Sequence, residues 1–300
     1  MREVFRRIGP LASVYRLVTI GRRMAALEKA LERLSEHDWT NGHELASLRA
    51  QADHLMSSVE VPDELAGEFV RWKAYHPLPD QPLVTVCVAT YNRARLLVER
   101  CIPSILQQTY GHLELVVVGD GCTDETAEAV GRINDARLRF VNLPQRGKYP
   151  ADPMLRWMVA GTQAINSALS MASGHFVTHL DDDDEYARDR LEKLVAFALS
   201  EGCDFAWHPF WREDGQGGWI LHEAREFARG HVTSSSVFYR SWFTCIPWNN
   251  EAYRFREPGD WNRFRRIKYL APVLMRYPEP LLWHYREGTQ RQGVRPGLQN

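Results

Sequence analysis

Apolar runs recur through the middle of the chain, and each is followed by a stretch of helical character. The four runs are LVTVCVAT (83–90), LELVVVG (113–119), LRFVNL (138–143) and HFVTHL (175–180). Continuous apolar, β-branched runs of this length are typical of strands buried on both faces of a sheet. The segments between them predict helices over 94–108, 123–134 and 154–172. Strands that alternate with helices favour an α/β fold built on a mostly parallel sheet with helices on both faces.

The first eighty residues follow another pattern. Apolar residues recur at intervals of three and four over 24–34 and again over 45–55, on either side of Asn41-Gly42. This spacing predicts two amphipathic helices, too short to form a long coiled coil. We interpret residues 1–80 as a helical extension packed on the main domain, with a dimerisation or docking element (residues 1–60) as the alternative. The Pro-rich segment HPLPDQP (76–82) predicts the boundary, so that residues 81–300 form the main domain.

Composition narrows the class of protein. A chain of 300 residues with 44% apolar and 25% charged residues is typical of a soluble globular protein. The net charge of -1 argues against nucleic-acid binding by bulk electrostatics. Five cysteines without CxxC spacing indicate neither a disulfide framework nor a zinc site.

The N-terminal segment bears on location. Arg16 interrupts the apolar stretch of residues 1–23, which makes them a poor secretory signal, so we expect a cytoplasmic protein. The same segment carries six arginines against one glutamate, interleaved with apolar residues. Such a segment suits the anionic inner face of the plasma membrane, and it equally suits a helix with solvated arginines.

Acidic residues follow the fourth predicted strand directly. Five of them, Asp181-Asp182-Asp183-Asp184-Glu185, stand in a row. Packed carboxylates repel one another, and a divalent cation among them offsets that cost. Mg²⁺ and Mn²⁺ prefer oxygen ligands such as carboxylates and phosphates. The run therefore predicts a cation site, with a solvated acidic loop or a helix N-cap as the alternative.

Two other predicted strands also end in residues of chemical interest. The first is followed by Thr90-Tyr91-Asn92-Arg93, and the second by Gly119-Asp120-Gly121. Either feature alone is compatible with core packing or an ordinary turn. Because the carboxyl ends of parallel strands meet at one sheet edge, we expect the aromatic ring, Asp120 and the acidic run to converge on one ligand site.

The motifs together resemble those of a known family. The segments VTVCVATYNRARLL, QQTYGHLELVVVGDGCTDET and ASGHFVTHLDDDDEYARDRL are similar, in order and spacing, to the signatures of the family 2 inverting glycosyltransferases. The resemblance runs from Leu83 to Leu191 and implies the GT-A fold, the fold of nucleotide-diphospho-sugar transferases. It implies that residues 81–191 bind the nucleotide-sugar and that residues 192–300 bind the acceptor.

The resemblance also implies roles for single residues. The positions it assigns to the donor are Ala89, Thr90, Tyr91, Asn92, Asp120, Arg156, Asn166, Asp181 and Asp182. Tyr91 would line the base pocket, Asp120 would accept a hydrogen bond from the base, and Asp181 or Asp182 would hold the ribose. Arg146 is the alternative to Arg156 at the diphosphate. Gly119 stands where the family usually carries a further aspartate.

The metal and the catalytic base are implied in the same way. Asp183 would bind Mn²⁺ or Mg²⁺, with His284 as a second ligand, although a lone histidine after an apolar run is more often structural. Asp260 in Glu257-Pro-Gly-Asp-Trp matches the family's catalytic base. Capping of the following helix is the alternative role for that aspartate.

The activity implied is transfer of a sugar, with inversion, to a hydroxyl of a glycan or lipid-linked acceptor in cell-surface polysaccharide synthesis. The first expectation for the donor is a UDP-sugar, followed by thymidine or guanosine donors. A sugar-phosphate nucleotidylyltransferase is a rival, but the segment after the first strand lacks the Gly-rich phosphate loop it needs. A non-catalytic scaffold with a degenerate transferase domain is the alternative from another class.

Overall fold

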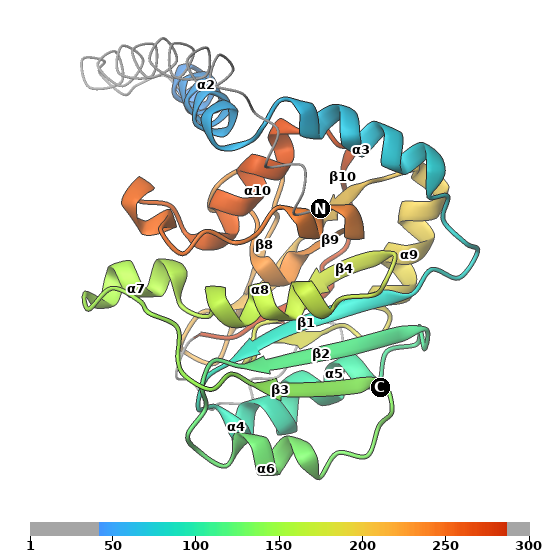
Figure 1. Ribbon diagram of the computed structural model, residues 1–300, viewed down its shortest axis with the longest axis vertical. Coiled ribbons are helices and arrows are strands. Elements are labelled where there is room, and N and C mark those ends of the chain that lie inside the picture. The colour runs from blue at the N-terminus through green and yellow to red at the C-terminus, as the bar shows by residue number, and fades with distance from the viewer. Residues whose placement is uncertain (1–41, 287–300) are drawn as a thin grey trace, which may run out of the picture.

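A seven-stranded sheet forms the centre of the computed structural model, which describes residues 42–286 (Figure 1). Its strand order is β10-β6-β9-β4-β1-β2-β3. The strands are β1 (Val84–Thr90), β2 (Leu113–Gly119), β3 (Leu138–Asn142), β4 (Phe176–His179), β6 (Phe205–Trp207), β9 (Val237–Arg240) and β10 (Leu274–Arg276). β1 pairs in parallel with both β2 and β4, and β9 runs antiparallel to β4 and β6. The four strands predicted from apolar runs are confirmed, and the mixed α/β class with them.

Helices cover both faces of this sheet. α4 (Ala94–Leu96), a π-helical turn (η2, Leu97–Cys101) and α5 (Ile102–Leu106) pack on one face together with α6 (Thr126–Gly131), and α8 (Thr162–Met171) packs on the other (Figure 1). The alternation of β1 explains why: Val84, Val86 and Val88 belong to the core beneath α5, whereas Cys87 belongs to the core beneath α8. Both faces are apolar because both are covered.

The helix predicted over 154–172 is wrong in one respect, because it is broken in two. α7 (Pro153–Val159) ends at Ala160, whose backbone is extended, and α8 starts after Gly161, whose φ is +78°. A left-handed residue of this kind favours glycine and cannot continue a helix. The apolar period runs through the break, so it did not reveal the change of direction.

A second, four-stranded sheet brings the end of the described chain back to the acidic run. Its order is β5-β11-β7-β8, with β5 at Glu185–Tyr186, β7 at Phe210–Glu213, β8 at Trp219–His222 and β11 at Leu282–His284. β11 pairs antiparallel with β5, so that Trp283 lies opposite Glu185. This pairing places His284 beside the acidic residues although about a hundred positions separate them in the sequence.

The remaining elements outside the extension are α9 (Arg190–Glu201), α10 (Gly259–Tyr269) and the short 3-10 turns η3 (Ser234–Ser236), η4 (Ser241–Cys245) and η5 (Ala252–Phe255). Of these, α9 contributes to the same core as α5, whereas α10 and η4 contribute to the same core as α8. Among the described helices, none combines the length and the apolar character that crossing a bilayer requires.

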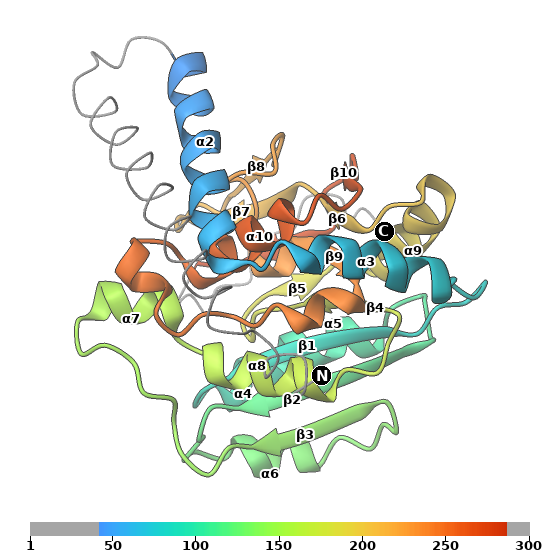
Figure 2. The same cartoon turned by 45° about the horizontal axis from the view of Figure 1, so that its top comes forward.

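The extension enters the described structure as α2 (Gly42–Glu60) and α3 (Glu64–Tyr75), and Figure 2 shows both against the elements of the C-terminal half. The pattern over 45–55 lies within α2, whereas residues 1–41, including the basic segment and the pattern over 24–34, lie outside the described residues. α3 was not predicted. It buries Phe69 against the rings of Trp242 and Phe243, and the proline-rich segment follows it before β1.

A buried ionic network fastens α2 to α10. The guanidinium of Arg265 donates to Glu257 at 2.8 and 2.9 Å, to Glu60 at 2.6 Å and to the Ser57 hydroxyl at 2.9 Å. Arg265 is 1% exposed, so its charge is stable there only because these partners replace water. α2 is therefore joined by specific polar contacts to the helix that carries Asp260.

Asp53, also on α2, is a carboxylate whose ionised form is destabilised by burial. Burial, and then the negative charge of Glu257, raise its pKa from 3.8 to about 6. Because the folded protein binds this proton more tightly than the unfolded chain does, stability falls as the pH rises from about 4 to about 6 and stays reduced above that.

We therefore expect Asp53→Asn to raise the melting temperature at pH 8 and to leave it nearly unchanged at pH 4. Asp53 is partly exposed, which screens its charge, so the expected gain is about 2–4 °C, the shift that about 1 kcal/mol gives a chain of this size. Thermal unfolding at the two pH values measures it. An equal shift at both would show that charge is not the cause.

Candidate active site

The carboxyl ends of β1, β2 and β4 meet at one edge of the sheet, as the strand order predicted. Arg93, which follows β1, lies 3.2 Å from the carboxylate of Asp182 and 2.5 Å from that of Asp183. The backbone N–H of Asp120, which follows β2, donates to the carbonyl of Thr90 at 2.8 Å. The three strand ends therefore build a single site, although Arg93 was not among the predicted site residues.

The acidic residues 181–184 strain one another electrostatically. Burial and then the charges of Asp184 and Asp183 raise the pKa of Asp181 to about 7. Burial raises the pKa of Asp182 to about 6, against the opposing charge of Arg93, and it raises that of Asp183 as well. Carboxylates held together in this way are poised to accept a cation, because a positive ion removes the cost of ionising them.

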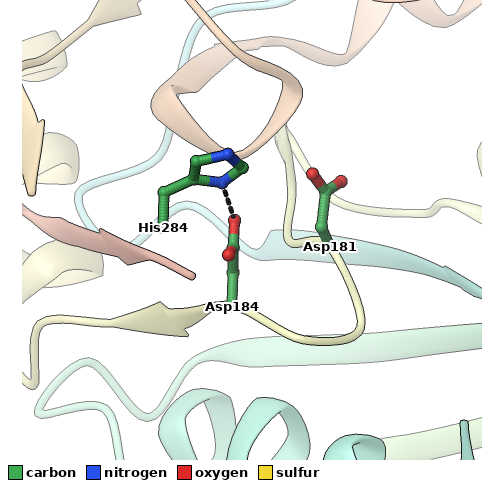
Figure 3. Close-up of side chains that lie close together, drawn as sticks. All are labelled: Asp181, Asp184 and His284. Carbon is green, nitrogen blue, oxygen red and sulfur yellow. Dashed lines mark hydrogen bonds and ion pairs between the residues drawn. The ribbon is translucent and has the colours of Figure 1, made fainter. Parts of the chain in front are cut away.

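Asp184 orients His284 (Figure 3). The Asp184 side chain is fully buried; one of its oxygens lies 2.8 Å from Nδ1 of His284, and the other accepts the backbone N–H of Tyr285 at 2.9 Å. The negative charge of Asp184 raises the pKa of His284 to about 9. Since Nδ1 is occupied, a cation would bind the other ring nitrogen, Nε2, in the carboxylate–histidine–metal arrangement common in proteins.

The donor set fits a divalent cation. One ligand atom from each of Asp181, Asp184 and His284 can be chosen so that all three lie within 4.8 Å of one another. The sequence predicted Asp183 and His284 as ligands, and the structure places Asp183 in an ion pair with Arg93 beside this group. The sequence analysis did not single out Asp184, because nothing in a run of five acids distinguishes the one that bonds to His284.

Asp260 lies next to the same group. It stands in the first turn of α10, where its Oδ1 accepts the backbone N–H of Trp261 at 2.7 Å. The backbone N–H of Ser234 and the charge of His284 are close enough to lower its pKa against the larger effect of burial. The hydroxyl of Ser234 donates to Asp181 at 2.9 Å. Ser234 thus bonds to the acidic run and lies beside Asp260. Burial raises the pKa of Asp260 to about 6.

The space around position 259 favours a residue without a side chain. A Cβ at this position would lie 3.1 Å from the backbone oxygen of Met158 and 3.3 Å from the ring of Trp248. A side chain at position 259, such as the glutamate often found there in the motif that the sequence resembles, would require α7 or Trp248 to move by a few tenths of an ångström. Asp260 therefore matches the predicted base although the residue before it is a glycine.

Asp120 is buried at the other end of the site. Its two oxygens accept the backbone N–H of Gly147 at 3.0 Å and the hydroxyl of Tyr149 at 2.8 Å. The guanidinium carbon of Arg146 lies 3.7 Å above the centre of the Tyr91 ring. The 146–149 segment therefore covers the predicted base pocket, which the sequence alone did not reveal.

Two candidates for the diphosphate remained from the sequence, and they lie in different places. Arg146 is next to Tyr91, with its Nε 4.0 Å from Asp120. Arg156 lies on α7 and donates to the carbonyl of Ala151 at 3.3 Å. The contacts favour Arg146 as the arginine within the predicted nucleotide pocket.

Asn166 and Asn92 make backbone contacts. The Asn166 amide donates to the carbonyl of Trp248 at 3.0 Å and accepts its N–H at 2.8 Å, which holds the segment before α10. Asn92, at a φ of +51°, accepts the N–H of Thr123 at 2.8 Å and so joins the loops after β1 and β2. Ala89 and Thr90 form the end of β1 itself.

Gly119 makes room for an asparagine. A Cβ there would lie 2.4 Å from the amide oxygen of Asn142, and that amide bonds both the N–H and the carbonyl of Cys122, at 2.8 and 2.9 Å. Asn142 on β3 thus orders the turn after β2. The turn is therefore held by Asn142, and it does not need an aspartate at position 119.

The sequence model of the family described as Glycosyl transferase family 2 matches residues 85–151 and 156–257, which is more than half of the chain. Among curated proteins, a putative teichuronic acid biosynthesis glycosyltransferase of Bacillus subtilis, TuaG, is 32% identical over 128 residues, 42% of this chain and 46% of that protein. An Escherichia coli UDP-Glc:alpha-D-GlcNAc-diphosphoundecaprenol beta-1,3-glucosyltransferase, WfgD, is 29% identical over 126 residues, 42% of this chain and 45% of its own. The aligned part thus spans less than half of each relative.

Solved structures agree in fold. TarS of S. aureus in complex with UDP-GlcNAc superposes with a TM-score of 0.54 at 21% identity, over 69% of this chain and 59% of that one. The mannosyltransferase PcManGT of Pyrobaculum calidifontis, in complex with GDP-Man and Mn²⁺, superposes with a TM-score of 0.51 at 21% identity, over 83% of this chain and 70% of that one. At this level of identity the likeness establishes the fold alone.

Proposed function

The chain belongs to glycosyl transferase family 2, and we propose that it transfers a sugar, with inversion, from a nucleoside-diphosphate donor to a hydroxyl of a glycan or lipid-linked acceptor. Relatives in the family take part in cell-surface polysaccharide synthesis. The observation that carries the proposal is that Ser234, which bonds to Asp181, and His284, which bonds to Asp184, both lie close enough to Asp260 to act on its pKa. This supports the proposal, because a direct displacement requires the residues that would hold the cation and the proposed base to lie side by side.

Each residue has a part in the proposed displacement. Asp260 accepts the proton of the acceptor hydroxyl as its oxygen attacks the anomeric carbon of the donor sugar. A divalent cation, when bound, neutralises charge on the departing diphosphate. We propose Asp181, the neighbouring Asp183 and Nε2 of His284 as the residues that would hold that ion. Both oxygens of Asp184 already bond to His284 and Tyr285, so Asp184 would fix the imidazole. One carboxylate base suffices, because inversion requires a single displacement.

The donor and acceptor are proposed from chemistry and from relatives. Tyr91, stacked by Arg146, offers an aromatic and cationic surface for a base and its phosphates. The neighbouring structures hold UDP, UDP-GlcNAc and GDP-Man, and we place a UDP-sugar first. WfgD carries a diphosphoundecaprenol-linked acceptor in its name, which supports a lipid-linked acceptor and work at the inner face of the plasma membrane.

Release of nucleoside diphosphate tests the proposal. The full chain is incubated with UDP-, dTDP- and GDP-sugars, with and without Mn²⁺, in the presence of membrane lipid extract as the source of acceptor. We expect one donor to release diphosphate in a manner that depends on acceptor and on metal. Formation of pyrophosphate from a nucleoside triphosphate and a sugar phosphate would indicate a nucleotidylyltransferase, and the absence of turnover with every donor would favour a scaffold.

The rate should also depend on pH through Asp260. The proposed base must be ionised, and burial raises its pKa to about 6. Below that value the base is protonated, so we expect kcat/KM to fall about tenfold for each pH unit below 6 and to level off above it. Initial rates between pH 5 and 8 measure this. A rate that stays constant from pH 5 to 8 would assign the base role to a carboxylate with an ordinary pKa.

A further inference from the structure

We propose that the tip formed by α7 and η5, with exposed Met154, Trp157 and Phe255, docks on an anionic membrane surface. This surface, the α7–η5 tip, also carries Arg156, Arg254 and Arg256. The inference rests on the proposed function, because it places the lipid-borne acceptor beside Asp260. The predicted basic segment 1–23 is a different part of the chain, outside the described residues.

The apolar side chains of the tip are turned to solvent. Met154 is 63% exposed, Trp157 is 60% exposed and Phe255 is 45% exposed. α7 and η5 pack against each other, and both views place them together at one extremity of the molecule (Figures 1 and 2). Large apolar residues that cluster on a protruding surface mark a contact site, because the folded chain gains nothing by exposing them.

The charges beside them fit anionic lipid. Arg254 and Arg256 lie on and after η5, Arg156 lies on α7, and Arg229 donates to the backbone carbonyl of Arg256 at 2.7 Å. The acids of the same segments are Asp152 and Glu251. Asp152 caps α7 through the N–H of Leu155, and Glu251 pairs with Arg254. On the two segments of the tip, three arginines stand against two carboxylates, which leaves the tip with a net charge of +1 on a chain whose net charge is -1. Basic residues near a membrane are attracted to anionic head groups, while aromatic and methionine side chains enter the interface.

The tip adjoins the proposed catalytic base. The backbone oxygen of Met158 on α7 lies 3.1 Å from where a Cβ of Gly259 would be, and Asp260 is the next residue. A lipid-linked acceptor must bring its hydroxyl to Asp260 while its tail stays in the bilayer. A membrane contact at the α7–η5 tip meets both conditions, since the surface that touches lipid and the base that receives the hydroxyl belong to adjoining segments.

A probe at the tip tests this directly. Trp157→Cys is labelled with an environment-sensitive fluorophore and mixed with phosphatidylcholine vesicles that contain or lack phosphatidylglycerol. We expect a blue shift and brighter emission with the phosphatidylglycerol vesicles, weakened by salt. Ile220→Cys on β8, where the native side chain is 50% exposed, is the matched control, and the labelled native chain gives the background of its own cysteines. The probe reports its own position, so any binding through residues 1–23 does not obscure it.

Three outcomes would overturn the proposal. The first is a probe at position 157 that responds to vesicles no more than the probe at position 220. The second is a shift that follows protein concentration without vesicles, which would indicate contact with a second copy. The third concerns the triple variant Met154→Ser, Trp157→Ser, Phe255→Ser, for which we expect vesicle partitioning to fall by at least about fivefold and diphosphate release with donor and detergent-solubilised acceptor to stay unchanged. A loss of that soluble activity would instead assign the tip to the acceptor pocket.

These experiments distinguish failure of the proposed transferase function from failure of the proposed membrane contact. If no donor is turned over while the labelled tip still responds to anionic vesicles, the membrane surface stands and the transferase proposal falls. If turnover is found and the tip does not respond, the reverse holds.

Discussion

Asp260→Asn is expected to lower kcat by about 10²–10⁴-fold, the usual contribution of a positioned general base. Asparagine has nearly the same shape, and its side-chain oxygen can still accept the N–H of Trp261 that Asp260 accepts at 2.7 Å. It cannot take up the proton of the acceptor hydroxyl. The affinity for the nucleotide-sugar should change little, because Asp260 acts on the acceptor side of the site. Turnover by diphosphate release and donor affinity by calorimetry separate the two quantities.

The alternative role of Asp260, a stabilising acid at the start of α10, makes another prediction. In that case Asp260→Asn would reduce the melting temperature in step with activity, and the residual rate would keep its dependence on pH. We expect instead an unchanged or higher melting temperature, because burial penalises the ionised carboxylate, and the loss of the decline below pH 6. Asp152→Asn is the matched control, because Asp152 caps α7 by accepting the N–H of Leu155 at 2.9 Å without touching the acidic run. Full activity in Asp260→Asn would mean that another group is the base.

The parallel half of the fold could be predicted because its strands are buried on both faces. Val84 to Val88 face two cores at once, which is why the run is continuously apolar and easily recognised. The convergence of Tyr91, Asp120 and the acidic run follows from the same topology, since ligands lie beyond the carboxyl ends of such strands. The reaction class followed from motifs placed at those ends.

The contacts that complete the site depend on pairings that local patterns do not contain. Asp184 meets His284 only because β11 returns antiparallel to β5, and β5 is two residues long. Tyr149 reaches Asp120 from a segment without regular structure. The attachment of α2 rests on Arg265, a fully buried cation within a helix that reads as polar and solvent-facing. Propensity could not predict it, because burial of charge is set by tertiary partners.

Removal of the divalent cation is the other change with a large expected effect. Chelation with EDTA should abolish sugar transfer, and Mn²⁺ should restore it, because neutralisation of the leaving diphosphate supplies several kcal/mol of the stabilisation of the transition state. Asp183→Asn should lower transfer at saturating Mn²⁺ by at least about 10²-fold, which corresponds to about 3 kcal/mol. Asp184→Asn should act through the imidazole it holds and weaken the apparent Mn²⁺ affinity by about 10–100-fold. Rates measured over a Mn²⁺ titration separate the two variants.

The stability of the same variants distinguishes a cation site from an acidic loop that merely caps or solvates. Burial and the charge of Asp184 raise the pKa of Asp183, so the metal-free protein bears a cost for ionising it. Asp183→Asn should therefore leave the melting temperature unchanged or higher without metal, and reduce the increase that Mn²⁺ gives. Asp189→Asn, which removes a surface ion pair with Lys193 outside the loop, is the control and should keep both the activity and the response to Mn²⁺. Transfer that survives EDTA, with a melting temperature indifferent to Mn²⁺, would mean that Arg93 and the protonated His284 balance these carboxylates and that no divalent cation assists the leaving group.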